Sequence, residues 1–247
     1  MTDLHTHVIP GIDDGSDSME TSVRMLKIAA ESGVTTLAAT PHFDRSCGYA
    51  NYVSDELEES FEALEREAAS IGIKLVKGME IFADEDVPEL LEQGLLWTLG
   101  GTRYFLTEFS FTEDPDYCAE FLYSCERRGF RPIIAHPERY KFIQHYPQTA
   151  YEWCRRGYGL LLNRGSLLGA FGEQAELTAV KLIKHGLAAG IASDAHGAGR
   201  RTPYMKDVRD LIAEDYGEDY AGLLLERNPA RILAGKELLG YEPYPFI

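Results

Sequence analysis

The 247-residue sequence predicts an α/β protein in which parallel strands form a closed or nearly closed barrel. Two observations carry this prediction. Short apolar, β-branched runs alternate with amphipathic segments, as in repeated strand–helix units. About seven such runs occur, which is close to the number that a barrel needs. An open, doubly wound sheet is the alternative architecture.

Each predicted strand is a run of apolar and β-branched residues bounded by turn-forming or polar residues. The seven runs cover residues 2–7, 34–43, 73–81, 103–110, 130–138, 157–165 and 187–196.

The helical segments lie between these runs, and a glycine follows each of them. Residues 55–71 form the clearest one, with apolar residues spaced by four and three positions along a single face, before Gly72. Its apolar residues are Leu57, Phe61, Leu64, Ala68 and Ile71. Similar segments are predicted over residues 17–32, 117–128 and 173–185.

Composition limits the possible partners. The chain carries 24 Lys and Arg against 40 Asp and Glu, a formal net charge of −16, which would repel a nucleic-acid backbone. No linker, low-complexity tract or close repeat divides the sequence. We therefore expect one domain over residues 1–247 and no nucleic-acid partner.

The four cysteines show neither C-x-x-C spacing nor a disulfide framework, so they are predicted to be reduced thiols. They are Cys47, Cys118, Cys125 and Cys154. No apolar run approaches the length of a membrane span, and no basic, apolar leader precedes the first motif. These features predict a cytoplasmic protein without membrane insertion.

The first strand carries two histidines in "DLHTH". Side chains at positions i and i+2 of a strand point to the same face, so His5 and His7 can project into one pocket. Two converging imidazoles indicate a metal site.

Further metal-capable residues occur at the carboxyl ends of most predicted strands, the edge where α/β barrels keep their active sites. The set is His5, His7, His42, Glu80, Glu108, His136, Asp194 and His196. Asp13 and Asp14 follow in the first loop, and either could add an oxygen ligand. Unrelated hydrogen-bonding residues are the alternative, but carboxylates are rarely buried without a partner. We predict a polynuclear metal site.

The donor set narrows the choice of metal. Imidazoles and carboxylates without thiolate suit Mn, Fe, Co or Zn, and several carboxylates allow bridging between neighbouring ions. Manganese is the first choice and zinc the second.

The motifs "DLHTH", "TPH", "GME", "TEF", "AHPER" and "SDAH" occur in the order typical of the PHP (polymerase and histidinol phosphatase) superfamily, which the chain resembles. More narrowly, "HVIPGIDDG", "TPHF", "EFS" and "HPER" are similar to the metal-dependent tyrosine-protein phosphatases of bacterial capsule and exopolysaccharide systems. The resemblance implies a distorted (β/α)7 barrel with three divalent metals at the carboxyl ends of the strands.

The resemblance also implies a distribution of ligands. It gives His5, His7, Glu80 and Asp194 to one metal, with Glu80 bridging to a second metal held by Glu108 and His136. It gives Asp14, His42 and His196 to the third metal. Many members of the superfamily have His where this chain has Glu108, which favours the tyrosine-phosphatase branch.

The function implied is hydrolysis of a phosphotyrosine protein, such as a bacterial tyrosine kinase that regulates capsule synthesis, by a metal-activated hydroxide. Arg139 and Arg201 match positions that bind phosphate in the resembled family, whereas Arg200 does not. Three alternatives stay open: a small-molecule phosphatase such as one acting on histidinol phosphate, an amidohydrolase, and a non-catalytic metal-binding scaffold.

The stretch "CERRGFR" also matches the C-x5-R spacing of thiol-dependent tyrosine phosphatases. That mechanism needs a glycine-rich loop at a helix N-terminus. Cys125 instead lies late in a predicted helix, on the same apolar face as Phe121, while Arg131 enters the next strand. We predict a buried, inert thiol at Cys125.

Overall fold

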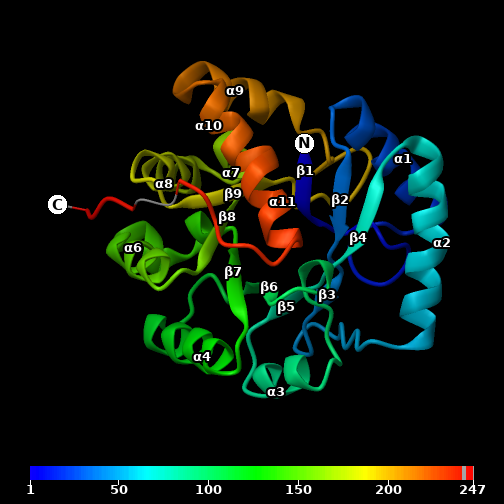
Figure 1. Cartoon of the computed structure of the whole chain (residues 1–247), viewed down its shortest axis with the longest axis horizontal. Helices are drawn as coiled ribbons and strands as arrows, with labels where there is room; N and C mark the ends of the chain where they lie inside the picture. The colour runs from blue at the N-terminus through cyan, green and yellow to red at the C-terminus, as the bar shows by residue number, and fades with distance from the viewer. Residues whose placement is uncertain (241–242, 247) are drawn as a thin grey trace.

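Parallel strands surrounded by helices form the centre of the computed structural model, which describes residues 1–240 and 243–246 (Figure 1). Every pair of neighbouring strands is parallel, and the strands belong to two sheets. The first sheet has the order β1 (Thr2–Thr6), β2 (Thr36–Ala39), β4 (Lys74–Lys77). The second has the order β3 (His42–Phe43), β5 (Glu80–Phe82), β6 (Tyr104–Glu108), β7 (Arg131–Ala135), β8 (Gly159–Asn163), β9 (Ala188–Ala192).

The first and last strands meet at their carboxyl ends, which joins the two sheets. Thr6 forms a parallel bridge with Ala195. The backbone N–H of His7 donates to the carbonyl of Ala195 at 2.8 Å, and that of Asp194 donates to the carbonyl of His5 at 2.9 Å. These bonds favour the distorted barrel over an open sheet, and they place the ends of β1 and β9 side by side.

Two predicted strands are each divided, so the prediction of seven unbroken strands is wrong at these places. Residues 34–43 form β2 and β3, and residues 73–81 form β4 and β5. Pro41 has no N–H for a ladder. At Gly78, a Cβ would lie 2.9 Å from Cγ2 of Thr40 and 3.0 Å from Cδ2 of Leu99. The segments around Gly78 and Thr40 therefore approach each other too closely for a side chain at position 78. Here the chain passes from the first sheet (β2, β4) to the second (β3, β5), which distorts the barrel.

The four predicted helices are confirmed to within two residues at each end. They are α1 (Met19–Glu31), α2 (Asp55–Ile71), α4 (Pro115–Arg127) and α8 (Glu173–Lys184). The hydroxyl of Ser54 accepts a hydrogen bond from the N–H of Leu57 at the start of α2, and Gly72 ends that helix in the left-handed conformation. These are the capping positions at which serine and glycine are favoured.

Shorter helices lie in the connections between the strands or follow the last strand, β9. They are α3 (Val87–Glu92), α5 (Lys141–His145), α6 (Gln148–Arg155), α7 (Arg164–Leu167), α9 (Lys206–Tyr216), α10 (Glu218–Gly222) and α11 (Asn228–Leu233). Single turns occur at η1 (Leu99–Gly101), η2 (Pro137–Arg139) and η3 (Leu223–Arg227).

A small apolar cluster lies among the strands of the barrel. Leu4, Leu106, Ile133 and Leu161 from four strands meet there, together with Ile232 of α11. The carbonyl of Ile232 accepts a hydrogen bond from the hydroxyl of Thr102, just before β6 begins, so α11 covers the amino ends of the strands. The carboxyl ends are left for the polar residues.

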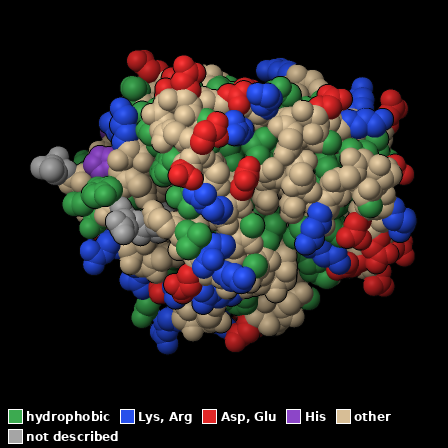
Figure 2. All heavy atoms as spheres, turned by 45° about the horizontal axis from the view of Figure 1, so that its top comes forward, with side chains coloured by type: hydrophobic (Ala, Val, Ile, Leu, Met, Phe, Trp, Pro, Cys, Tyr) green, Lys and Arg blue, Asp and Glu red, His purple; other side chains and the backbone are tan. Residues whose placement is uncertain are grey.

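Charged side chains of both signs are interspersed on the face shown in Figure 2. This pattern is typical of a solvated protein surface, to which the net charge of −16 is ascribed. None of the helices in residues 1–240 is long and apolar enough to cross a membrane.

Candidate metal centre

The predicted ligands come together near the carboxyl ends of the strands, except that His42 and Glu80 are the first residues of the short strands β3 and β5. The first group is His5, His7, Glu80 and Asp194, all buried, with possible ligand atoms within 4.8 Å of one another. Oε2 of Glu80 lies 2.9 Å from Nε2 of His5 and 3.1 Å from Nε2 of His7. Oδ1 of Asp194 lies 3.5 Å from both of these nitrogens. Such a set of converging donor atoms suits a cation.

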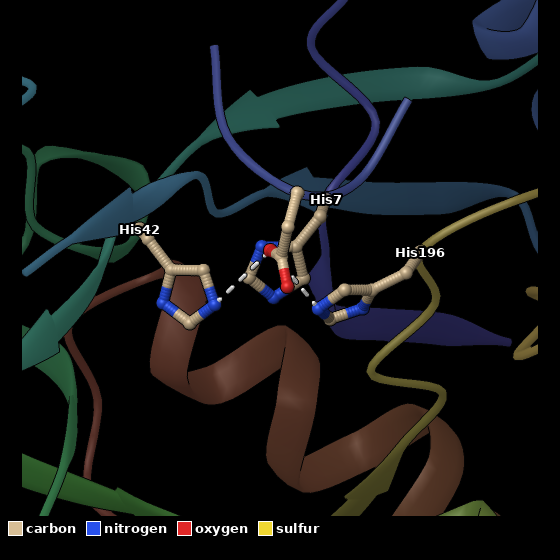
Figure 3. Close-up of side chains that lie close together, drawn as sticks. His7, His42 and His196 are labelled. Atoms are coloured by element: carbon tan, nitrogen blue, oxygen red, sulfur yellow. Dashed lines mark ion pairs between the residues drawn. The ribbon is translucent and has the colours of Figure 1, made fainter. Parts of the chain in front are cut away.

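The second group surrounds the carboxylate of Asp14. Its Oδ1 lies 3.5 Å from Nε2 of His42 and 3.5 Å from Nε2 of His196. Figure 3 shows the imidazoles of His7, His42 and His196 close together, and Asp14 completes this group. The ligand atoms of these four residues also lie within 4.8 Å of one another.

The third group shares Glu80 and His42 with the others and adds Glu108. His136 joins it, because its Nε2 lies 3.0 Å from Oε1 of Glu80 and 3.5 Å from Oε2 of Glu108. Oε1 of Glu80 therefore faces His136, while Oε2 faces the imidazoles of the other groups. A carboxylate in this position can bridge two cations.

The electrostatics of the site also fit bound cations. Burial, and then the neighbouring carboxylates of Glu80 and Asp194, hold the pKa of Glu108 well above its usual value. Within residues 1–240 and 243–246, Nδ1 of His42 and Nδ1 of His136 are buried without a hydrogen-bond partner. Divalent cations would offset the crowded carboxylates and are the ions that this donor set binds.

Asp13 and Asp14 have different positions, which the residues alone left open. Half of the Asp14 side chain is exposed to solvent and its Oδ1 faces the histidines, whereas the side chain of Asp13 is fully buried. Oδ2 of Asp13 lies 2.8 Å from Nδ1 of His7 and accepts a hydrogen bond from the N–H of His42 at 2.9 Å. Although burial alone would raise the pKa of Asp13, the hydrogen bond and charge of His7 together with the backbone N–H groups of His42 and Gly15 outweigh it and lower the pKa to about 2. Asp13 therefore orients an imidazole and lies outside the candidate ligand groups.

The two predicted phosphate-binding arginines lie beside the ligands. Oδ2 of Asp194 is 2.6 Å from an amino nitrogen of Arg201 and 3.7 Å from one of Arg139. The same oxygen accepts a hydrogen bond from Nδ2 of Asn163 at 2.7 Å. Asp194 thus turns one oxygen toward the imidazoles and the other toward the arginines.

Asn163 is absent from the predicted site. It ends β8, the one predicted strand without a metal-capable residue at its carboxyl end. The strand-end pattern would have found it if amides had been considered with carboxylates and imidazoles.

The backbone is strained at three site residues. His136, Asp194 and Arg201 have φ angles of 36°, 50° and 47°, and they are the non-glycine residues with positive φ in the described part of the chain. The N–H of His196 donates to the carbonyl of Arg201 at 2.9 Å, which closes the loop between them. Strained backbone of this kind is concentrated at functional sites.

Residues 1–234 match the family described as "Capsular polysaccharide synthesis, CpsB/CapC". The chain belongs to the CpsB/CapC family.

Curated relatives of this CpsB/CapC member are named as tyrosine phosphatases. The tyrosine-protein phosphatase YwqE of Bacillus subtilis is 29% identical over 247 residues, covering 99% of this chain and 96% of the relative. The putative tyrosine-protein phosphatase CapC of Staphylococcus aureus is 33% identical over 227 residues, covering 91% and 88%. The predicted resemblance to capsule-system tyrosine phosphatases is confirmed.

A crystal structure from the work on YwqE of Bacillus subtilis and CpsB of Streptococcus pneumoniae, described as metal-dependent tyrosine phosphatases, has the same fold. Its TM-score is 0.91 at 28% identity, with 100% of both chains covered. The expected distorted barrel of a metal-dependent phosphatase family is therefore confirmed.

Cys125 lies away from this centre. It is fully buried in the last turns of α4, and burial raises the pKa of its thiol to about 12. Arg131 begins β7, at the opposite end of the strand from His136. The spacing of Cys125 and Arg131 does not build a phosphate loop.

Proposed function

We propose that this chain is a metal-dependent protein tyrosine phosphatase. The observation that carries the proposal is the overlap of three groups of imidazoles and carboxylates, with two arginines beside the outer oxygen of the Asp194 carboxylate. The names of the family relatives support the same activity.

The donor groups support three divalent cations, with manganese first and iron, cobalt or zinc as the other candidates. One cation would be held by His5, His7, Glu80 and Asp194, a second by Glu80, Glu108 and His136, and the third by Asp14, His42 and His196. When bound, such cations make water nucleophilic at neutral pH and neutralise charge on phosphoryl oxygens.

The arginines hold the substrate. Arg139 and Arg201 present planar guanidinium groups that match two phosphate oxygens, and neither group can coordinate a cation. Asn163 and Asp194 position Arg201 by a chain of hydrogen bonds through one carboxylate oxygen. A tyrosyl group, with a pKa near 10, leaves more readily than an alkoxide, so it needs little help from an acid.

The substrate we propose is a phosphotyrosine protein of the capsule system, such as a bacterial tyrosine kinase. The match to a capsular polysaccharide synthesis family supports this choice. Histidinol phosphate is the competing substrate, since it is a phosphate monoester with an alkyl leaving group.

The test is phosphate release by protein stripped with chelator and then reconstituted with Mn²⁺, Zn²⁺ or Mg²⁺. We expect no activity without metal and more activity with Mn²⁺ than with Mg²⁺, because imidazole prefers the softer ion. A phosphotyrosine peptide should be hydrolysed faster than histidinol phosphate. Full turnover in excess chelator would contradict metal dependence, and the reverse substrate preference would favour a small-molecule phosphatase.

His136→Ala gives a second readout that does not depend on activity. The variant should lose bound metal and keep the circular dichroism of the folded barrel. His145→Ala is the matched control, because His145 is exposed on α5 and its Nδ1 bonds only a backbone carbonyl of its own helix. Equal metal content in both variants would refute the assignment of His136.

A further inference from the structure

Two phenyl rings hold Arg139 between them beside the metal centre. Cζ of Arg139 lies 4.3 Å from the ring centre of Phe111 and 4.4 Å from that of Phe171. Both distances are typical of cation–π contacts. Cζ of Arg201 lies 5.8 Å from the ring of Phe171, so one ring contacts both arginines.

These rings connect the buried ligands with the surface. The ring centre of Phe111 lies 5.8 Å from that of His136, in an edge-on arrangement. Phe111 is nevertheless 37% exposed, and Phe171 is only partly buried. A core phenylalanine would be covered, so these two rings present apolar surface to whatever enters beside the arginines.

The position of Phe171 depends on a glycine. A Cβ on Gly165 would lie 2.6 Å from Cε2 of Phe171, so the ring occupies the space where a side chain would be. The N–H of Gly165 donates to Oδ1 of Asn163 at 2.6 Å, which fixes this backbone next to the site. Gly172, with φ of 89°, then turns the chain into α8. The loop after α7 is built to place this ring over the arginine.

We propose that Phe111 and Phe171 form an aromatic collar that recognises the phenyl ring of phosphotyrosine while Arg139 and Arg201 hold its phosphate. The inference rests on the proposed phosphatase function and names the feature that selects aryl over alkyl phosphate esters. An aryl phosphate carries its charge and its flat apolar ring in a rigid unit, and the collar places guanidinium groups and phenyl rings side by side to match it. An alkyl phosphate offers no ring for these contacts.

The collar is tested with Phe171→Leu and Phe111→Leu, which keep apolar volume and remove the ring. Two peptides of the same sequence, one with phosphotyrosine and one with phosphoserine, are hydrolysed by the Mn²⁺-reconstituted protein. The quantity measured is the ratio of their kcat/KM values, relative to the same ratio for the parent protein. The intrinsic difference in leaving-group reactivity cancels in this comparison.

We expect each substitution to lower the relative ratio roughly 3- to 10-fold, the range of a lost aromatic contact. A loosened Arg139 would reduce hydrolysis of both peptides alike and leave the ratio unchanged. Phe171→Tyr should restore the ratio, because it restores the ring. An unchanged ratio in both leucine variants would overturn the inference, even if overall activity falls.

Gly165→Ala tests the collar without removing a ring. Its new methyl group would meet only the far end of the Phe171 side chain at under 3.0 Å, so the ring should move while the backbone stays folded. The relative ratio should fall as it does for Phe171→Leu. A parent-like ratio in Gly165→Ala, with the ring shown to be displaced by its structure, would overturn the role of Phe171.

Tyr123→Leu is the matched control. Tyr123 is an exposed ring that contacts the guanidinium groups of Arg127 and Arg156, near the amino-terminal ends of β7 and β8. It has the same kind of contact at the opposite end of the barrel, so its ratio should equal that of the parent. If the parent protein does not hydrolyse the phosphotyrosine peptide, the result counts against the proposed function instead. Failure of the collar and failure of the proposed function are therefore distinguishable.

Discussion

Asp13 is the residue whose role differs most from that of its neighbour in sequence. Its carboxylate accepts from His7 and from the backbone N–H of His42, so it holds one imidazole and the start of β3 in place. Carboxylates behind a ligating imidazole commonly change metal affinity by 10- to 100-fold, roughly, when they are removed.

Asp13→Ala should therefore bind Mn²⁺ roughly 10- to 100-fold more weakly while its circular dichroism stays native. Equilibrium titration of the metal-free protein with Mn²⁺ measures the change. Asp17→Ala is the control in the same loop, because Asp17 is exposed and its carboxylate bonds the side chains of Ser18 and Thr21 at the start of α1 rather than a residue of the site. Equal affinities for the two variants would show that Asp13 does not support His7.

Arg201→Ala should reduce kcat/KM for a phosphotyrosine peptide roughly 100-fold, because a charge-assisted donor to the phosphoryl oxygens is lost. Its metal content should stay unchanged, since a guanidinium group cannot coordinate a cation. Elemental analysis after dialysis checks the second statement. Arg200→Ala, at the exposed neighbouring position, should keep parent activity.

Loss of metal from Arg201→Ala would show that the arginine supports Asp194 structurally. The contact between them at 2.6 Å is the reason to measure both quantities in the same samples.

The residues that the sequence predicts best are those whose chemistry and position agree. Histidines and carboxylates at several strand ends predict a metal site because such residues are unusual there. Asp13 and Asn163 bind other side chains, so their types do not distinguish them from ordinary loop residues. The roles of Phe111 and Phe171 are still harder to predict, because both rings contact Arg139 and the three residues come from separate segments of the chain.

At the scale of elements, the crossing at Gly78 shapes the barrel. Gly78→Ala should lower the free energy of unfolding by about 1–3 kcal/mol, because the new methyl group overlaps Thr40 and Leu99. Urea unfolding of the metal-free protein measures this change. Gly222→Ala is the control, because Gly222 is helical and a Cβ added there would lie 3.7 Å from its nearest neighbour, a side-chain atom of Arg227. A Gly78→Ala protein as stable as the parent would show that the crossing has room to adjust.

The helix α4 contains the misleading cysteine. Cys125→Ser should keep most of its metal-dependent turnover, because the thiol is buried in the packed face of α4. Burying a hydroxyl in place of the thiol should cost about 1–2 kcal/mol of stability. Cys47→Ser, at an exposed thiol, should change neither quantity. Abolished turnover in folded, fully metallated Cys125→Ser would overturn the proposed mechanism.

Element prediction succeeded where local signals are complete. The helix α2 has its serine cap, its apolar face and its terminal glycine within one segment, and its bounds follow from them. The divided strands could not be predicted in the same way. The apolar run over residues 73–81 continues through Gly78, and the close approach of Thr40 and Leu99 comes from other parts of the chain.

At the scale of the whole molecule, the metal centre joins the two sheets. Glu80 begins β5, whereas His5 lies in β1, and crowded carboxylates at this junction repel one another without a cation. Bound metal should therefore stabilise the entire fold.

Saturation with Mn²⁺ at 100 times its dissociation constant would add about 2.7 kcal/mol to the free energy of unfolding. For a chain of this size, Tm should rise by roughly 5–10 °C. Calorimetry over a series of Mn²⁺ concentrations checks this, and His136→Ala should show a smaller rise than His145→Ala. A Tm independent of Mn²⁺ in a protein shown to bind it would mean that the unfolded chain binds the ion equally well.

The left-handed backbone at His136, Asp194 and Arg201 has a consequence for protein engineering. Such conformations cost of order 1–3 kcal/mol for side chains with a Cβ, and glycine relieves that cost. A directed-evolution campaign on the metal-free protein that selects only for survival at high temperature should therefore enrich glycine at these three positions. A parallel campaign that selects for phosphate release should retain the side chains. Thermal tolerance and catalysis would thus diverge at the same three codons, and thermostable libraries of this enzyme should hold those codons constant.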